Sequence, residues 1–283
     1  MKVAILSSAD TKTIKQLFEN ADALIFTAGA GMGVDSGLPD FRGNEGMWKA
    51  YPELGKQKIN FTSIANPQAF KRDPYLAWGF YGHRLDLYRK TTPHHGFTLL
   101  KNIAEEQKKP YFVFTSNVDG QFQKAGFDDH LIYECHGSIH HLQCSIPCSH
   151  TIWSADELLP QIDQTRCQWQ GKLPSCPSCG ALARPNILMF DDYHWISERQ
   201  EQQRKRLEDW VKYYKTVLVI ESGAGTAVPT VRYFSERFSP NFIRINPREY
   251  DLPFTGGLAI AATAETGIKS IQQALGQAYS FLC

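Results

Sequence analysis

Short apolar runs alternate along this chain with segments whose apolar residues recur at helical spacing. Each run stops at a polar or glycine residue, which is typical of a strand buried on both faces of a parallel sheet. Four such strands are predicted, at Ala23 to Thr27, Tyr111 to Thr115, Val217 to Ile220 and Phe242 to Ile245.

Three segments have the pattern of an amphipathic helix. Asp10 is expected to cap the first, in which Ile14, Leu17 and Phe18 share a face. Ile196 to Val211 is predicted as a highly charged helix, and a last helix is predicted near Thr266 to Tyr279. Alternation of strands and helices favours an α/β fold with a Rossmann-like parallel sheet, which binds its ligand at the carboxyl ends of the strands.

Two stretches interrupt this alternation, one rich in aromatic residues and loops and one containing cysteine pairs and prolines. They predict a smaller inserted module, approximately residues 44–95 and 138–183. The larger Rossmann-like part would then comprise approximately residues 1–43, 96–137 and 184–283. No repeat or long linker divides the chain, so both parts are expected to form one domain.

Composition narrows the classes of partner. The chain has 283 residues, 21% of them charged, and a formal net charge of +1. Its overall charge therefore does not favour binding to nucleic acid or to a membrane. No apolar stretch approaches the roughly 18 residues of a membrane helix, and the first residues lack a secretory pattern. The expected location is cytoplasmic, with no membrane partner and no specific nucleic acid.

Seven cysteines in such a chain indicate a metal site or free thiols rather than a disulfide framework. Cys144 and Cys148 form a C-x3-C pair, and Cys176 and Cys179 form a C-x2-C pair. Two such pairs supply the four thiolates that tetrahedral zinc prefers and leave no position for water. We therefore predict a structural Zn²⁺ that folds the cysteine-rich insertion.

A glycine-rich segment follows the first predicted strand. Gly29, Gly31 and Gly33 let the backbone turn sharply and approach a dinucleotide, and Gly29, Ala30 and Gly31 are the expected cofactor contacts. The usual third glycine is displaced, and such spacing also occurs in ordinary turns. An acid, a ring and a cation, Asp40, Phe41 and Arg42, then follow a proline.

The segment GAGMGVDSGLPDFRG resembles the signature of the sirtuins. Further blocks similar to sirtuin motifs follow in the same order: TSNVDG at residues 115–120, ECHGS at residues 134–138 and INP at residues 245–247. With the cysteine pairs, the resemblance spans roughly Leu24 to Asn246. It implies an NAD-dependent protein lysine deacylase that transfers the acyl group to ADP-ribose and releases nicotinamide.

The resemblance also implies roles for particular residues. His136, one of nine histidines, would deprotonate a ribose hydroxyl, and an imidazole with a near-neutral pKa suits that task; His140 and His141 lie just beyond it. Asn117 and Asp119 would orient the nicotinamide end, although an Asx-rich turn is the alternative. Further cofactor contacts are expected from Asp40, Phe41, Arg42, Ser116, Val118, Gly223, Ala224, Gly225 and Asn246.

The predicted substrate contacts lie in two other segments. Tyr81 and Arg84 have a Y-x-x-R spacing that places both on one helix face, and sirtuins that remove succinyl or malonyl groups carry a similar motif. A guanidinium can pair with the carboxylate of an acidic acyl group; the alternative is an aromatic helix that only packs. Ile187 to Phe190 would bind the acylated-lysine peptide as an added strand.

Some positions depart from the usual sirtuin pattern. Gly33 stands where serine is usual, Ser116 where glutamine is usual, and residues 223–225 read GAG in place of GTS. Gly33 and Ser116 are both expected to face the cofactor. The departures keep open a protein ADP-ribosyltransferase or an NAD hydrolase, and, as a different class, a non-catalytic NAD-sensing module.

Overall fold

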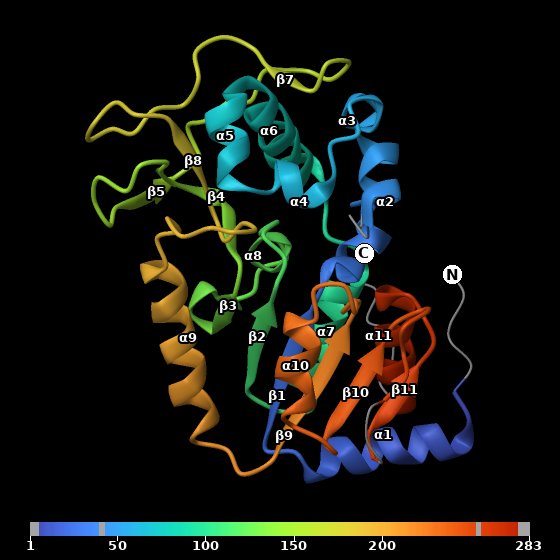
Figure 1. Cartoon of the computed structure of the whole chain (residues 1–283). Helices are drawn as coiled ribbons and strands as arrows, with labels where there is room; N and C mark the ends of the chain where they lie inside the picture. Colours follow the sequence, from blue (N-terminus) through green and yellow to red (C-terminus); the bar gives the residue numbers. More distant parts are fainter. Residues whose placement is uncertain (1–5, 40–42, 253–255, 277–283) are drawn as a thin grey trace, which may run out of the picture.

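A computed structural model describes residues 6–39, 43–252 and 256–276. Its centre is a six-stranded parallel sheet in the order β11-β10-β9-β1-β2-β3 (Figure 1). The four expected strands are present as β1 (Ala23–Ala28), β2 (Tyr111–Thr115), β9 (Val217–Ser222) and β10 (Phe242–Ile245). Two short strands extend the edges, β3 (Ile132–Glu134) and β11 (Leu258–Ile260). The predicted Rossmann-like class is confirmed.

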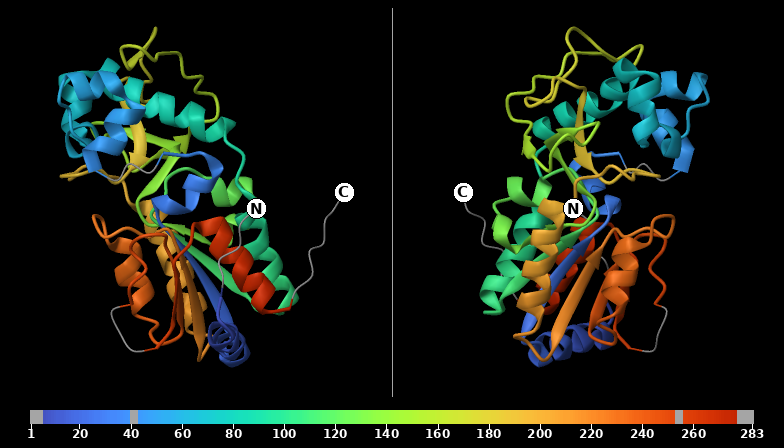
Figure 2. Two further views of the ribbon diagram at one scale, coloured as in Figure 1. Left: turned by 90° about the vertical axis from the view of Figure 1, so that its right-hand side faces the viewer. Right: turned by 60° about the vertical axis from the view of Figure 1, so that its left-hand side comes forward.

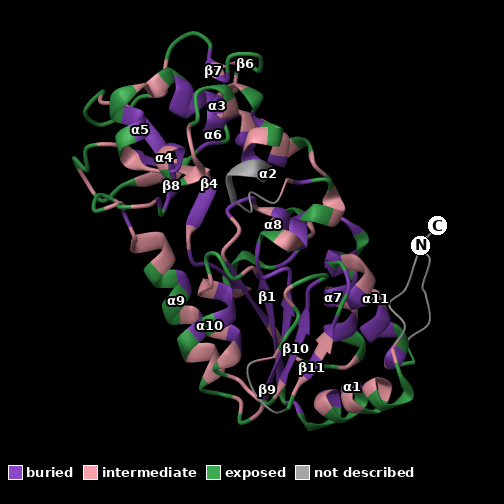
Figure 3. Ribbon diagram, turned by 45° about the vertical axis from the view of Figure 1, so that its right-hand side comes forward, coloured by how far each residue is buried: buried purple, intermediate pink, exposed green. Residues whose placement is uncertain are grey.

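Helices cover both faces of this sheet (Figure 2). Successive residues of a strand point to opposite faces, so Leu24 and Phe26 pack with one group of helices and Ile25 with the other. The first group comprises α1 (Ser8–Asn20), α7 (His95–Glu106) and α11 (Ala264–Ala274), and the second α9 (Glu198–Val211) and α10 (Thr230–Glu236). The strands are accordingly the most continuously buried part of the chain (Figure 3).

Helix ends differ from the sequence predictions. The cap of α1 is Ser7, whose side chain accepts from the amide of Asp10, while the Asp10 carboxylate accepts from Ser7 in return. The expectation that Asp10 is the cap was therefore wrong, because it is the second half of a capping box. Helix α9 begins at Glu198 rather than Ile196, and α11 begins two residues before Thr266.

A second part lies beyond the carboxyl ends of the strands (Figure 1). Its antiparallel sheet has the order β5-β4-β8, formed by β4 (Gly137–Cys144), β5 (Ile152–Ser154) and β8 (Ala183–Ile187). Its helices are α2 (Gly43–Ala50), α3 (Pro52–Lys56), α4 (Phe61–Ile64), α5 (Pro67–Arg72) and α6 (Pro74–Lys90), and β6 (Ile162–Asp163) pairs with β7 (Gln168–Trp169).

One hydrophobic cluster joins the two interrupting segments. Trp78 and Phe80 from α6 pack in it with Ile139 from β4 and Trp169 from β7. Because this cluster is separate from those on the two faces of the parallel sheet, we propose that the two segments form the smaller module expected from the sequence. None of the helices that the structure describes has the length and apolar character needed to cross a membrane.

Candidate functional site

A cavity of about 370 Å³ lies where the carboxyl ends of β1, β2 and β9 meet the smaller part. Strand β1 lies between β2 and β9. The strand order runs outward from β1 to β2 and β3 on one side and to β9, β10 and β11 on the other. Ligands of open α/β sheets bind at such a reversal of strand order. Most of the predicted site residues line this cavity: Gly29, Ala30, Tyr81, Arg84, Ser116, Asn117, Val118, Asp119, His136, Ile187, Phe190, Gly223, Ala224 and Gly225.

Two glycine loops, the first after β1 (residues 29–31) and the second after β9 (residues 223–225), contact each other through their backbones. Gly31 donates its amide to the Gly223 carbonyl at 3.0 Å. A Cβ on Gly29 would lie 2.8 Å from the Cα of Ala224, and one on Gly223 would lie 2.3 Å from the carbonyl carbon of Gly31. Gly223 also has a φ of +65°, which disfavours other residues. The glycines therefore bring these two loops together at the cavity edge.

Some predicted cofactor residues lie elsewhere. Asn246 is buried after β10, where its Nδ2 donates to the Ala224 carbonyl at 2.9 Å and its Oδ1 accepts from the amide of Arg248. It supports the second glycine loop without lining the cavity. A side chain at Gly33 would meet Leu38 at 3.0 Å, and the expectation that this position faces the cofactor stays a prediction. Asp40, Phe41 and Arg42 lie outside the described residues.

The turn after β2 has a defined hydrogen-bond pattern. Thr115 Oγ1 accepts from the amide of Asn117, whose Nδ2 donates to the Gly29 carbonyl at 3.0 Å. Asp119 Oδ1 accepts from the amide of Gln121, and burial raises the pKa of Asp119 to about 6. The Asx-type turn is therefore present, and the same side chains also line the cavity.

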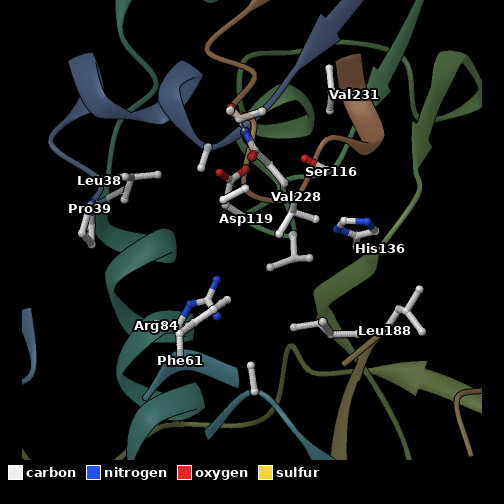
Figure 4. A pocket seen from close by; sticks show the side chains of 18 of the residues that line it. Leu38, Pro39, Phe61, Arg84, Ser116, Asp119, His136, Leu188, Val228 and Val231 are labelled. Atoms are coloured by element: carbon white, nitrogen blue, oxygen red, sulfur yellow. Dashed lines mark hydrogen bonds between the residues drawn. The ribbon is translucent and has the colours of Figure 1, made fainter. Parts of the chain in front are cut away.

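His136 follows β3 and enters the cavity opposite Arg84 (Figure 4). Burial lowers its pKa below the usual 6.5, and a hydrogen bond with the Ser116 backbone offsets this in part. The imidazole is therefore neutral at pH 7 and can accept a proton. Its Nε2 lies 3.3 Å from the Thr230 hydroxyl at the start of α10, a neighbour that sequence reasoning missed.

The other two candidate histidines have different surroundings. His140 Nε2 lies 3.0 Å from the Asp119 carbonyl and so supports the turn after β2. Burial is the main cause that lowers the pKa of His141 to about 4. Neither side chain lines the cavity, which leaves His136 as its histidine among the described residues.

Tyr81 and Arg84 enter the same cavity from α6, as the Y-x-x-R spacing predicts. Both are buried, and the Arg84 guanidinium lies 5.7 Å from the centroid of the Tyr81 ring. Burial raises the pKa of Tyr81 to about 12, so its phenol is protonated at neutral pH. The cavity thus contains a buried cation beside a neutral hydrogen-bond donor.

Ile187 to Phe190 form one wall of the cavity, but several of their amides are already bonded. Leu188 donates to the His136 carbonyl and Phe190 to the Ala65 carbonyl, both at 2.9 Å. Met189 donates to Asp192, which forms a buried bidentate pair with Arg184 at 2.7 and 2.8 Å. An added peptide strand would have to use other groups or compete with Asp192, so this binding mode stays a prediction.

Several apolar cavity residues carry no chemical signal in the sequence. Leu38, Phe61, Leu188, Val228 and Val231 come from four separate segments and line the cavity beside the polar groups (Figure 4). Leu188 and Val228 are also partly exposed, at 39% and 47%. An apolar wall of this kind suits the methylene chain of a lysine side chain.

The four predicted zinc ligands come together in the smaller part. All four Sγ atoms lie within 4.8 Å of one another, with Cys144 3.7 Å from Cys179 and Cys148 3.6 Å from Cys176. Thiolates at about 2.3 Å from a tetrahedral Zn²⁺ lie about 3.8 Å apart, so these residues fit the ion. Cys135 and Cys167 are instead buried within hydrophobic clusters.

Comparisons with known proteins identify a family that this chain resembles. A family model described as the Sir2 family matches residues 29–223. An NAD-dependent protein deacylase of Aquifex aeolicus is 27% identical over 266 residues, covering 92% of this chain and 98% of that protein. One from Pyrococcus furiosus is 34% identical over 178 residues, covering 63% of this chain and 64% of that protein.

Solved structures show the same fold. A Sir2 homolog–NAD complex superimposes with a TM-score of 0.69 at 23% identity, covering 98% of this chain and 96% of that one. A Sir2 bound to acetylated peptide gives a TM-score of 0.68 at 17% identity, covering 95% of this chain and 99% of that one. With the family model matching well over half of its length, this chain belongs to the Sir2 family, the sirtuins.

Proposed function

We propose that this protein is an NAD-dependent protein lysine deacylase. One observation carries the proposal: a neutral His136 shares a cavity with the two loops suited to the dinucleotide and with the Arg84 pocket on α6. The family assignment and the relatives named NAD-dependent protein deacylases support it. The substrates would be NAD and an acylated lysine in a protein or peptide.

Different residues of the cavity would bind the substrates and transfer the proton. When bound, NAD supplies the ribose carbon that takes the acyl oxygen, and it supplies nicotinamide as the leaving group. His136, held neutral by burial, would accept a proton from a ribose hydroxyl at its ring nitrogen. Asn117 and Asp119 would orient the nicotinamide end, and the apolar wall at Leu188 and Val228 would exclude water around the lysine chain.

Peptide-dependent nicotinamide release tests this proposal. The native protein should release nicotinamide from NAD together with loss of the acyl group from an acyl-lysine peptide. The same peptide with unmodified lysine is the matched control and should give only background release. Equal release with both peptides would support the NAD hydrolase alternative, for which the altered residues Ser116 and Ala224 in the cavity are the motivating observation.

The proposed zinc site also bears on location. Four clustered thiolates and two buried free cysteines suit a compartment in which thiols remain reduced. We therefore propose a cytoplasmic location.

Replacing Arg84 by methionine tests the acyl class. Methionine keeps the length and apolar packing among the rings of α6 but removes the cation. We expect kcat/KM for succinyl- and malonyl-lysine peptides to fall by roughly 10- to 100-fold relative to an acetyl-lysine peptide, because a charged hydrogen bond is lost. Lys90→Met, which removes an exposed cation from the same helix, is the control. Unchanged relative rates in Arg84→Met would remove Arg84 from acyl selection.

A further inference from the structure

A second tyrosine of α6 lies one helical turn beyond Arg84. Tyr88 is 5% exposed and lines the same cavity, yet the Y-x-x-R spacing does not include it. Residues four apart on a helix are neighbours, so Tyr88 and Arg84 share a face. The cavity is therefore lined by two phenols of α6, Tyr81 and Tyr88, together with Arg84.

The Tyr88 hydroxyl binds one edge of the Arg84 guanidinium. Arg84 donates from Nε at 2.9 Å and from Nη2 at 2.7 Å, and both bonds end on the same phenol oxygen. The guanidinium carbon also lies 5.3 Å from the centroid of Phe80 and 5.4 Å from that of Tyr88. These contacts fix the plane of a side chain that would otherwise lose considerable rotamer entropy on binding a ligand.

The two hydrogen bonds leave the positive charge of Arg84 in place. Burial raises the pKa of Tyr88, so the phenol is protonated at neutral pH and does not neutralise the guanidinium. Arg84 is itself only 8% exposed. The terminal carboxylate of an acidic acyl group is a charge-complementary ligand for a guanidinium held in this way.

The phenol also has a hydrogen of its own to donate. Its oxygen accepts two N–H groups through its two lone pairs, and the O–H bond then points away from the guanidinium. We propose that Tyr88 is a further specificity residue of the acyl pocket. It holds the Nε–Nη2 edge of Arg84 and donates its hydroxyl hydrogen to the terminal carboxylate of a succinyl- or malonyl-lysine. This inference rests on the proposed deacylase function.

A purely structural role is the competing explanation. The Tyr88 carbonyl accepts from Gln121 Nε2 at 3.2 Å and so connects α6 to the segment after the Asp119 turn. Replacing Tyr88 by phenylalanine separates the two explanations. It keeps the ring and the backbone contact and removes only the hydroxyl that contacts Arg84.

The experiment compares succinyl- and acetyl-lysine peptides of one sequence at saturating NAD. In Tyr88→Phe, we expect kcat/KM for the succinyl peptide to fall by roughly 10- to 100-fold, mainly through KM. The value for the acetyl peptide should change less than about threefold, because that acyl group has no carboxylate to lose contact with. Tyr75→Phe, at an exposed position of the same helix, is the matched control and should change neither value.

One further readout tests whether Tyr88 and Arg84 act together. In an Arg84→Met background, Tyr88→Phe should lower the succinyl rate by less than it does in the native protein, because the two residues act together. An equal fall for both peptides, or an unchanged preference in an active Tyr88→Phe protein, would overturn this inference alone. Absence of deacylation by the native protein with either peptide would instead overturn the proposed function.

Discussion

Replacing His136 by alanine is expected to lower kcat/KM for deacylation by about 10²- to 10⁴-fold, the usual contribution of a positioned general base. The ring lies in the cavity, and its described side-chain neighbour is the Thr230 hydroxyl at 3.3 Å. The fold should therefore tolerate the change. Nicotinamide release and peptide deacylation measure the activity, and thermal unfolding of the variant verifies that it is folded.

The pH profile of the native protein checks the same role. Burial lowers the pKa of His136 below the usual 6.5, so the neutral form predominates at pH 7 and becomes protonated only as the pH falls through that lowered pKa. We expect kcat/KM to be lost on the acid side of that pKa. His130→Ala, at an exposed histidine, is the control. Full activity in a folded His136→Ala protein would place the base elsewhere.

Removing the metal is expected to have the second large effect. Stripping Zn²⁺ with a chelator, or the Cys176→Ser variant, should destabilise the cysteine-rich part by several kcal/mol and lower Tm by about 10 °C. Cys176 and Cys179 come just before β8, whose last residue, Ile187, lines the cavity, so deacylation should fall as well. Metal analysis of the native protein should find about one zinc per chain.

A cysteine outside the cluster provides the control for this prediction. Cys167 is buried in the hydrophobic cluster of the smaller part and is not among the four clustered thiols. Cys167→Ala should therefore keep its zinc even if its packing is weakened. Metal-free protein with full activity and an unchanged Tm would contradict a structural role for the ion.

Within the parallel sheet, the sequence predicted the four longer strands and missed the two shortest. The apolar runs of β1, β2, β9 and β10 are buried on both faces, so their hydrophobic content alone marks them. Strands β3 and β11 have three residues each, too few for a run to be distinguished from a loop. Asp10 was misplaced because both members of a capping box favour helix starts, and only the hydrogen bonds show which one is the cap.

The polar part of the site was predictable for a topological reason. Parallel strands bring their carboxyl ends to one edge, so residues that follow β1, β2 and β9 meet there although they are far apart in sequence. Leu188 and Val228 have no such signal, because single apolar residues in loops are common. Tyr88 could have been found from its spacing of four from Arg84. Thr230 could not, because its contact with His136 depends on how α10 packs.

The products of the reaction test the central claim most directly. Native protein is incubated with NAD and a panel of acetyl-, succinyl- and malonyl-lysine peptides, and every product is identified by mass spectrometry. A deacylase should yield free lysine peptide, nicotinamide and O-acyl-ADP-ribose in equal amounts. Free ADP-ribose beside an intact acylated peptide, or ADP-ribose attached to protein, would contradict the account.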